Sequence, residues 1–85
     1  MTEKTKVEYF SDDSLFMITH TKNGKRHSIK GPAQSEWWRT GQMATRSYYV
    51  NDRLHRVDGP AYIQWHQDGT LWHEDYYLNG EKQND

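Results

Sequence analysis

A period-two alternation of hydrophobic and polar residues marks the most regular segment of the chain. Residues 61–65 read Ala-Tyr-Ile-Gln-Trp, which places the first, third and fifth side chains on one face of a β-strand. His-Gln-Asp-Gly follows at 66–69, and Asp-Gly accepts the positive φ that a tight hairpin turn requires. Residues 71–78 are rich in aromatics and are expected to pair back as the second strand.

This hairpin pattern recurs with a period of 28 residues. The frames 23–50 and 51–78 align without a gap, and nine columns are identical: Asn23/Asn51, His27/His55, Gly31/Gly59, Pro32/Pro60, Ala33/Ala61, Trp37/Trp65, Gly41/Gly69, Tyr48/Tyr76 and Tyr49/Tyr77. A period of this length indicates one supersecondary unit stacked on copies of itself.

The repeat predicts one all-β domain over residues 1–85. It divides the chain into a partial repeat (1–22), two full repeats (23–50 and 51–78) and a C-terminal stub (79–85). Helices are not expected, because Gly or Pro interrupts every helical spacing of apolar residues. We therefore predict an antiparallel meander of three hairpins and six strands. Its strands are expected at 7–10 with 15–22, 33–38 with 43–50, and 61–65 with 71–78, and its turns near 11–14, 39–42 and 67–70.

The turns and junctions carry the conformationally special residues. Gly41 and Gly69 are expected at positive φ. Asn-Gly at 23–24 and Asn-Asp at 51–52 are expected to end the outgoing strands, and Gly-Pro at 31–32 and 59–60 to reset the chain. Between these breakers, Ile29 and Val57 are expected to point inward.

Composition limits the classes of function. The chain is 33% hydrophobic and has four Trp, six Tyr and two Phe, which favours a thin sheet over a two-layer core. Its net charge of -1 provides no basic surface for a phosphate backbone, so nucleic-acid binding is not expected. The chain has no cysteine and begins with the polar MTEKTK. We expect a soluble cytoplasmic protein without a membrane segment.

A resemblance adds to this picture. Residues 51–61 (NDRLHRVDGPA), 68–70 (DGT) and 76–81 (YYLNGE) resemble the "NGKLHR-DGPA…DGT…WYLNGK" tandem repeat of many small bacteriophage proteins. They are more loosely similar to MORN-type repeats. The match spans 23–82, with Ser28 and Lys30 replacing the Arg and Asp of the motif. The resemblance implies a MORN-like single-layer sheet and a phage origin, and hence the host cytoplasm as the compartment.

The histidines and serines do not form a persuasive catalytic or metal pattern. His27 and His55 share a column, which favours one structural role used twice, since zinc needs three or four converging ligands. His66 and His73 with a nearby carboxylate remain an alternative surface metal site, although solvated strand ends are favoured. No Ser lies in a nucleophile elbow and the glycines are dispersed. We predict a protein that is not an enzyme and has no cofactor.

The aromatic residues suggest two faces. Tyr9, Trp37 and Trp65 fall one period apart and are expected to line the buried face of the sheet. Trp38, Tyr62 and Trp72 are expected on the opposite face. The predicted partner-binding residues are Trp38, Tyr48, Tyr62, Trp72 and Tyr76.

These residues favour a non-enzymatic protein-interaction module, a small phage protein that binds and inhibits a host or defence protein. Two alternatives remain open. One is a structural homo-oligomer, such as a homodimer, in which edges or aromatic faces pair by two-fold symmetry. The other is an aromatic platform for a carbohydrate or nucleotide.

Overall fold

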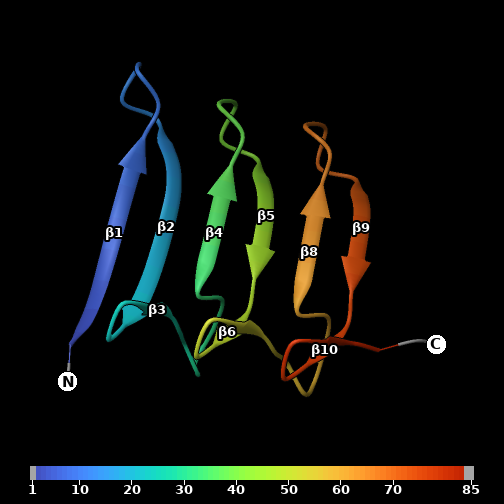
Figure 1. The fold of residues 1–85 in the computed structure, drawn as a ribbon. Helices are drawn as coiled ribbons and strands as arrows, with labels where there is room; N and C mark the ends of the chain where they lie inside the picture. Colours follow the sequence, from blue (N-terminus) through green and yellow to red (C-terminus); the bar gives the residue numbers. More distant parts are fainter. Residues whose placement is uncertain (1, 84–85) are drawn as a thin grey trace.

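Three long hairpins stand side by side in chain order (Figure 1). The computed structural model describes residues 2–83, and within them it contains strands and turns but no helix. The long strands are β1 (Glu3–Tyr9), β2 (Leu15–Lys22), β4 (Gln34–Trp37), β5 (Met43–Ser47), β8 (Tyr62–Trp65) and β9 (Leu71–Asp75). They pair antiparallel in the order β1-β2-β4-β5-β8-β9. The predicted all-β antiparallel meander is confirmed.

The turns of the long hairpins share one hydrogen-bond pattern. In the middle hairpin, Trp38 N–H donates to the Gln42 carbonyl (2.8 Å) and Gly41 N–H donates to the Trp38 carbonyl (2.9 Å). Gly41 and Gly69 have φ of 94° and 90°, as predicted. The equivalent residue of the first hairpin is Asp13, whose φ is 69°.

Short two-residue hairpins form a second row at the base of the sheet. They are β3 (Lys25–Arg26), which pairs with the end of β2, then β6 (Tyr49–Val50) with β7 (Arg53–Leu54), and β10 (Tyr77–Leu78) with β11 (Glu81–Lys82). Both residues of each connecting turn have positive φ, at 23–24, 51–52 and 79–80. Positive φ at both central positions defines a type I′ turn, which Asn-Gly and related pairs favour.

The expectation of unbroken strands over 43–50 and 71–78 is therefore wrong. Each strand is interrupted at a tyrosine that is identical in the two repeats, Tyr48 or Tyr76. Tyr48 N–H donates forward to the Ala61 carbonyl (2.7 Å), whereas the Tyr49 carbonyl accepts backward from Ser28 N–H (3.0 Å). Because adjacent residues bond to opposite neighbours, the chain leaves the large sheet between them and enters the row of short hairpins.

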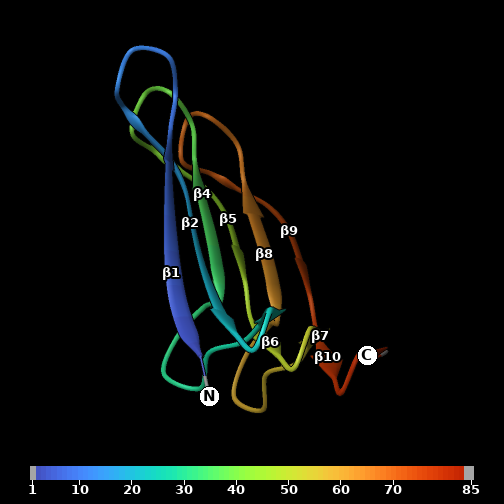
Figure 2. The same ribbon diagram turned by 60° about the vertical axis from the view of Figure 1, so that its left-hand side comes forward.

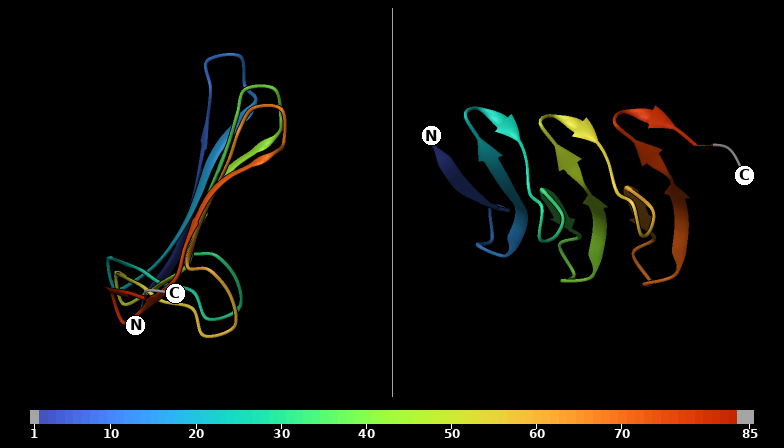
Figure 3. Two further views of the ribbon diagram at one scale, coloured as in Figure 1. Left: turned by 90° about the vertical axis from the view of Figure 1, so that its right-hand side faces the viewer. Right: turned by 90° about the horizontal axis from the view of Figure 1, so that it is seen from below.

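The sheet is one layer thick. The molecule measures 36 × 36 × 16 Å along its principal axes, and the turned view in Figure 2 and the edge-on view in Figure 3 show a single twisted sheet. At its base, the short hairpins lie on one side and the loops over residues 28–32 and 56–60 lie on the other (Figure 3, left). We call these loops the first loop and the second loop.

The residues with little solvent exposure are all small. They are Ala33, Ala44, Thr45, Ser47 and Ala61, and among the described residues no large side chain is fully buried. Ala33 and Ala61, both 0% exposed, lie where neighbouring hairpins meet. Ala61, for example, donates to the Asp75 carbonyl (2.9 Å) and accepts from Tyr48 N–H. Cross-strand pairs and backbone ladders, rather than a two-layer core, therefore stabilise this fold.

Strand pairing defines two chemically different faces, because directly paired residues project to the same side. We call one the apolar face, although it includes Arg46 and Glu74. With them it carries Val7, Tyr9, Ile18, Ser35, Trp37, Ile63 and Trp65. We call the other the polar face: Lys6, Glu8, Met17, Thr19, Gln34, Glu36, Thr45, Ser47, Tyr62, Gln64, His73 and Asp75.

Candidate interaction surface

The two loops stand on the side of the apolar face. The first loop borders the same groove as Ile18 and Ser35, which belong to that face. The tips of the loops carry Ile29 and Val57, whose side chains are 80% and 81% exposed. The expectation that these residues point inward is wrong. A single-layer sheet offers no second layer to receive them, so the loops project them into solvent.

Arg56 holds the second loop in place. Its guanidinium carbon lies over the Tyr48 ring, 4.1 Å from the ring centroid. It also donates to the Pro60 carbonyl (3.2 Å) and pairs with Asp58 at 3.4 Å. A Cβ at Gly59 would stand 2.9 Å from Arg56 Cζ. The glycine therefore lets the loop close over the guanidinium.

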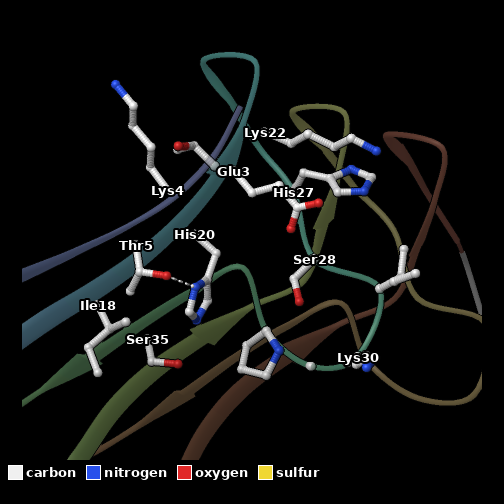
Figure 4. A pocket seen from close by; sticks show the side chains of 14 residues that line it. Glu3, Lys4, Thr5, Ile18, His20, Lys22, His27, Ser28, Lys30 and Ser35 are labelled. Carbon is white, nitrogen blue, oxygen red and sulfur yellow. Dashed lines mark hydrogen bonds between the residues drawn. The ribbon is translucent and has the colours of Figure 1, made fainter. Parts of the chain in front are cut away.

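The first loop lacks this support, because Ser28 and Lys30 occupy the columns of Arg56 and Asp58. A groove of about 750 Å³ opens between this loop and the ends of β1 and β2. Figure 4 shows Thr5 and His20 on its floor, where Thr5 Oγ1 and His20 Nδ1 form a hydrogen bond of 2.9 Å. A second groove of about 610 Å³ runs between the first and second loops. Exposed apolar loop tips thus alternate with open grooves.

His27 and His55 play one structural role twice, as their shared column predicts. His27 Nδ1 accepts the N–H of Asn51 (3.1 Å), and His55 Nδ1 accepts the N–H of Asn79 (2.9 Å). Each ring thereby fixes the first residue of the type I′ turn in the next repeat. The contact links successive units and differs from the packing beside Gly-Pro that the sequence suggested.

His66 and His73 have separate partners. The His66 ring stacks on Trp72, with centroids 4.8 Å apart, while His73 Nε2 lies 2.6 Å from the Asp75 carboxylate. Lys82 also reaches Asp75, at 3.4 Å. Among residues 2–83, no three His, Cys, Asp or Glu side chains converge as a metal site would require.

Charged contacts also tie the short hairpins together. Arg26 lies over the Tyr49 ring at 4.0 Å and its Nε is 2.7 Å from Asp52 Oδ1. Hydrogen bonds from Arg26 hold the pKa of Asp52 below its ordinary value. Both side chains are 40% exposed or more, so solvent screens the pair and its contribution to stability is small.

Two turn aspartates have a local role. Asp12 Oδ1 accepts the hydroxyl and the N–H of Ser14, and Asp68 Oδ1 accepts those of Thr70. These hydrogen bonds lower the pKa of both carboxyl groups. Because each carboxylate bonds within its own turn, it stabilises that turn and is not arranged as a general base.

The five residues predicted to bind a partner do not form one patch. Tyr62 lies on the polar face, opposite Ser47 and Asp75, and burial together with the Glu36 carboxylate raises its pKa. Trp38 lies at the middle turn, where its Nε1 donates to the Trp65 carbonyl (3.2 Å).

The other three lie elsewhere. Tyr48 is half-buried under Arg56, while Trp72 and Tyr76 are 56% and 43% exposed. Trp72 has no partner in the register of β8 and β9, because the pairs step from Gln64↔His73 to Trp65↔Leu71 at a strand irregularity. The expectation that Trp72 lies on the face opposite Trp65 therefore stays a prediction.

The sequence reasoning missed the loop tips as surface features. Their signal is present in the repeat. In both loops, a β-branched aliphatic residue stands two positions before the glycine of the Gly-Pro pair. It also treated Trp37 and Trp65 as buried. They remain only half-buried, because nothing within residues 2–83 covers the apolar face.

Comparisons with protein-family models, curated proteins and solved structures found no match to the chain. Over the part of the chain described, no helix has the length and apolar character needed to cross a membrane.

Proposed function

We propose that this protein is a non-enzymatic module that binds a protein partner through its apolar face and the two loop tips. The single observation that carries the proposal is the equivalent exposure of Ile29 and Val57, at 80% and 81%. Both stand on the side of the sheet that bears Trp37 and Trp65. Large apolar side chains that gather on one surface and stay open to solvent are typical of interaction sites.

The chemistry of this surface fits a protein better than a charged ligand. Indole rings and aliphatic tips provide large contact areas, and aromatic residues concentrate in the centre of protein interfaces. The grooves beside the loops provide depressions into which partner side chains can pack. The polar face, with its ion pairs and hydrogen-bonded side chains, stays in solvent in this proposal.

The class of partner rests on the resemblance of residues 23–82 to phage tandem repeats. We place the partner among host or phage proteins in the cytoplasm of a bacterial host. Inhibition of a host defence protein is a use that suits a small phage-encoded binding module. Occupation of the partner's own interface would be sufficient for such inhibition and needs no catalytic group.

Affinity capture with matched variants tests the choice of face. The double variant Ile29→Ser with Val57→Ser removes both exposed tips without touching the sheet, so it should keep the melting temperature. It should capture the partner at least about tenfold more weakly, because two apolar contacts are lost. Tyr62→Ala is the matched control, since it removes an aromatic ring from the polar face.

We expect the control to capture the partner as well as the wild-type protein does. Loss of capture by Tyr62→Ala, with full capture by the loop-tip variant, would instead assign binding to the polar face. Equal capture by the wild-type protein, the loop-tip variant and Tyr62→Ala would show that neither the loop tips nor Tyr62 contribute to the interface.

A further inference from the structure

The two ends of the sheet leave apolar side chains exposed that the interior repeats cover. Among residues 2–83, eight large hydrophobic residues are exposed, and six of them lie in the first strand or in the segment from β9 to β10: Val7, Tyr9, Leu71, Trp72, Tyr76 and Leu78. Tyr76 is 43% exposed, whereas its repeat equivalent Tyr48 is half-buried. Leu71 is 53% exposed, whereas its equivalent Met43 is half-buried. In the interior of the sheet, the next repeat covers the equivalent residues Tyr48 and Met43.

The backbone of β1 is open along its outer side. His20 N–H points to β4, where it donates to the Ala33 carbonyl (2.7 Å). Because successive residues of an antiparallel strand point to alternate neighbours, Thr19 points to β1 and pairs with Lys6. The N–H and C=O groups of Thr5 and Val7 therefore face away from β2, toward solvent.

The outer side of β9 is open in the same way. The Asp75 carbonyl accepts from Ala61 N–H, so Asp75 points to β8. By alternation, the backbone groups of Glu74 point outward. Within the described residues 2–83, each end of the sheet thus presents an unpaired strand edge, which is a template for pairing with another chain.

The interior junctions show how these edges fit together. Between repeats, β5 pairs with β8 as Thr45↔Gln64, Arg46↔Ile63 and Ser47↔Tyr62. The β2–β4 junction has the equivalent register. When this register is carried one repeat further, β9 meets the β1 of a second copy as His73↔Glu8, Glu74↔Val7 and Asp75↔Lys6.

Polar side chains at this register are complementary. Asp75, which Lys82 of its own chain contacts at 3.4 Å, would face the ammonium group of Lys6, and the His73 ring would lie within reach of the Glu8 carboxylate, all on the polar face. The outward backbone groups of Glu74 and Val7 face each other and can exchange hydrogen bonds.

We propose that the two edges join copies of this chain head to tail, with β9 of one copy pairing with β1 of the next to continue the sheet. The contact is heterologous, so it leaves a free edge at each end. It can therefore add further copies. This surface is distinct from the loop tips, and the proposal does not depend on the proposed partner.

Sedimentation across micromolar to millimolar protein provides the first test. The mass should rise with concentration, and Val7→Pro should weaken association by about tenfold or more, since it removes an outward donor at the edge. Val57→Ser is the matched control, because it removes an exposed aliphatic residue from the second loop, whose groove is lined by no residue of β1 or β9. It should associate as the wild-type protein does. A monomer at every concentration would overturn the proposal.

Disulfide trapping gives the orientation and does not depend on the proline variant folding. The chain has no cysteine, so Glu8→Cys and His73→Cys each introduce a single thiol. Tyr48 N–H bonds to Ala61, so alternation makes Thr45–Gln64 a non-hydrogen-bonded pair with closely spaced side chains. The equivalent residues 73 and 8 are therefore suited to cross-linking.

Mild oxidation of an equal mixture of the two variants should give mixed dimers well above the one-half expected from random pairing. An excess of Glu8→Cys dimers or of His73→Cys dimers would show two-fold pairing of like edges and overturn the head-to-tail arrangement. Random pairing would show that the edges do not recognise each other.

Discussion

Substituting alanine at two glycines should change stability in opposite directions. Gly41 has a φ of 94°, and no atom lies within 4 Å of the Cβ that alanine would add. Gly31 also has open space at its Cβ, but its φ lies outside the left-handed region. The pair therefore separates backbone strain from steric contact, because neither added methyl group meets a neighbour.

The magnitudes follow from the backbone alone. A left-handed conformation costs a residue with a Cβ about 1–2 kcal/mol, and alanine recovers about 0.4–1 kcal/mol by restricting the unfolded chain. Gly41→Ala should thus lower the free energy of unfolding by about 1 kcal/mol. Gly31→Ala has only the second effect and should raise it by about 0.4–1 kcal/mol.

Thermal unfolding followed by circular dichroism measures the difference. For a domain of this size, 1 kcal/mol corresponds to a shift of about 4–8 °C, so the two melting temperatures should lie on opposite sides of the wild-type value. Asp13→Gly, at the equivalent turn position with a φ of 69°, should raise stability by less than about 1 kcal/mol. Equal melting temperatures for Gly41→Ala and Gly31→Ala would refute the assignment of strain to the turn.

Three further changes probe the links between repeats. His55→Ala should lower stability by about 1 kcal/mol and accelerate amide exchange at Asn79 but not at Asn51, because only the first loses its acceptor; equal acceleration at both would contradict this. Ala61→Leu should destabilise by about 1–3 kcal/mol in denaturant unfolding, since Ala61 is 0% exposed; unchanged stability would show that the junction can expand. The raised pKa of Tyr62 predicts a phenolate that forms above its ordinary value of 10.0 in an absorbance titration and disappears in Tyr62→Phe. The unfolded residue ionises first, so stability should fall as the pH rises above that value; a uniform titration of all tyrosines would count against this.

The repeat made the long hairpins predictable. Alternation in residues 61–65 and the Asp-Gly turn predict one hairpin. The 28-residue period then predicts the equivalent hairpins in the rest of the chain. Gly41 and Gly69 could be assigned positive φ because the turn chemistry is local. Such features depend on a few adjacent residues, which a sequence displays directly.

The short hairpins were not predicted, although their signal is equally local. Asn-Gly at 23–24 is a strong type I′ signal, but it was interpreted as the end of a strand rather than as a hairpin of its own. The break at Tyr48 depends on which neighbour each backbone group bonds. That choice is made by packing between repeats, and the pattern of apolar residues does not encode it.

The candidate surface was the least predictable part. Ile29 and Val57 are hydrophobic, and hydrophobicity alone favours an interior position, but a sheet of one layer has no interior to offer. Trp72 falls at an irregularity next to Trp65, where the alternation of a regular strand no longer assigns a face. Exposure and register are properties of the assembled sheet.

Hydroxyl-radical footprinting of the free protein and of its complex with the captured partner tests the apolar face most directly. Side chains on both faces are oxidised in the free protein, because the sheet is one layer thick. In the complex, we expect protection of Ile29, Val57 and Trp65, with oxidation of Tyr62 and His73 unchanged. Protection of Tyr62 and His73, with the loop tips still oxidised, would contradict binding through the apolar face.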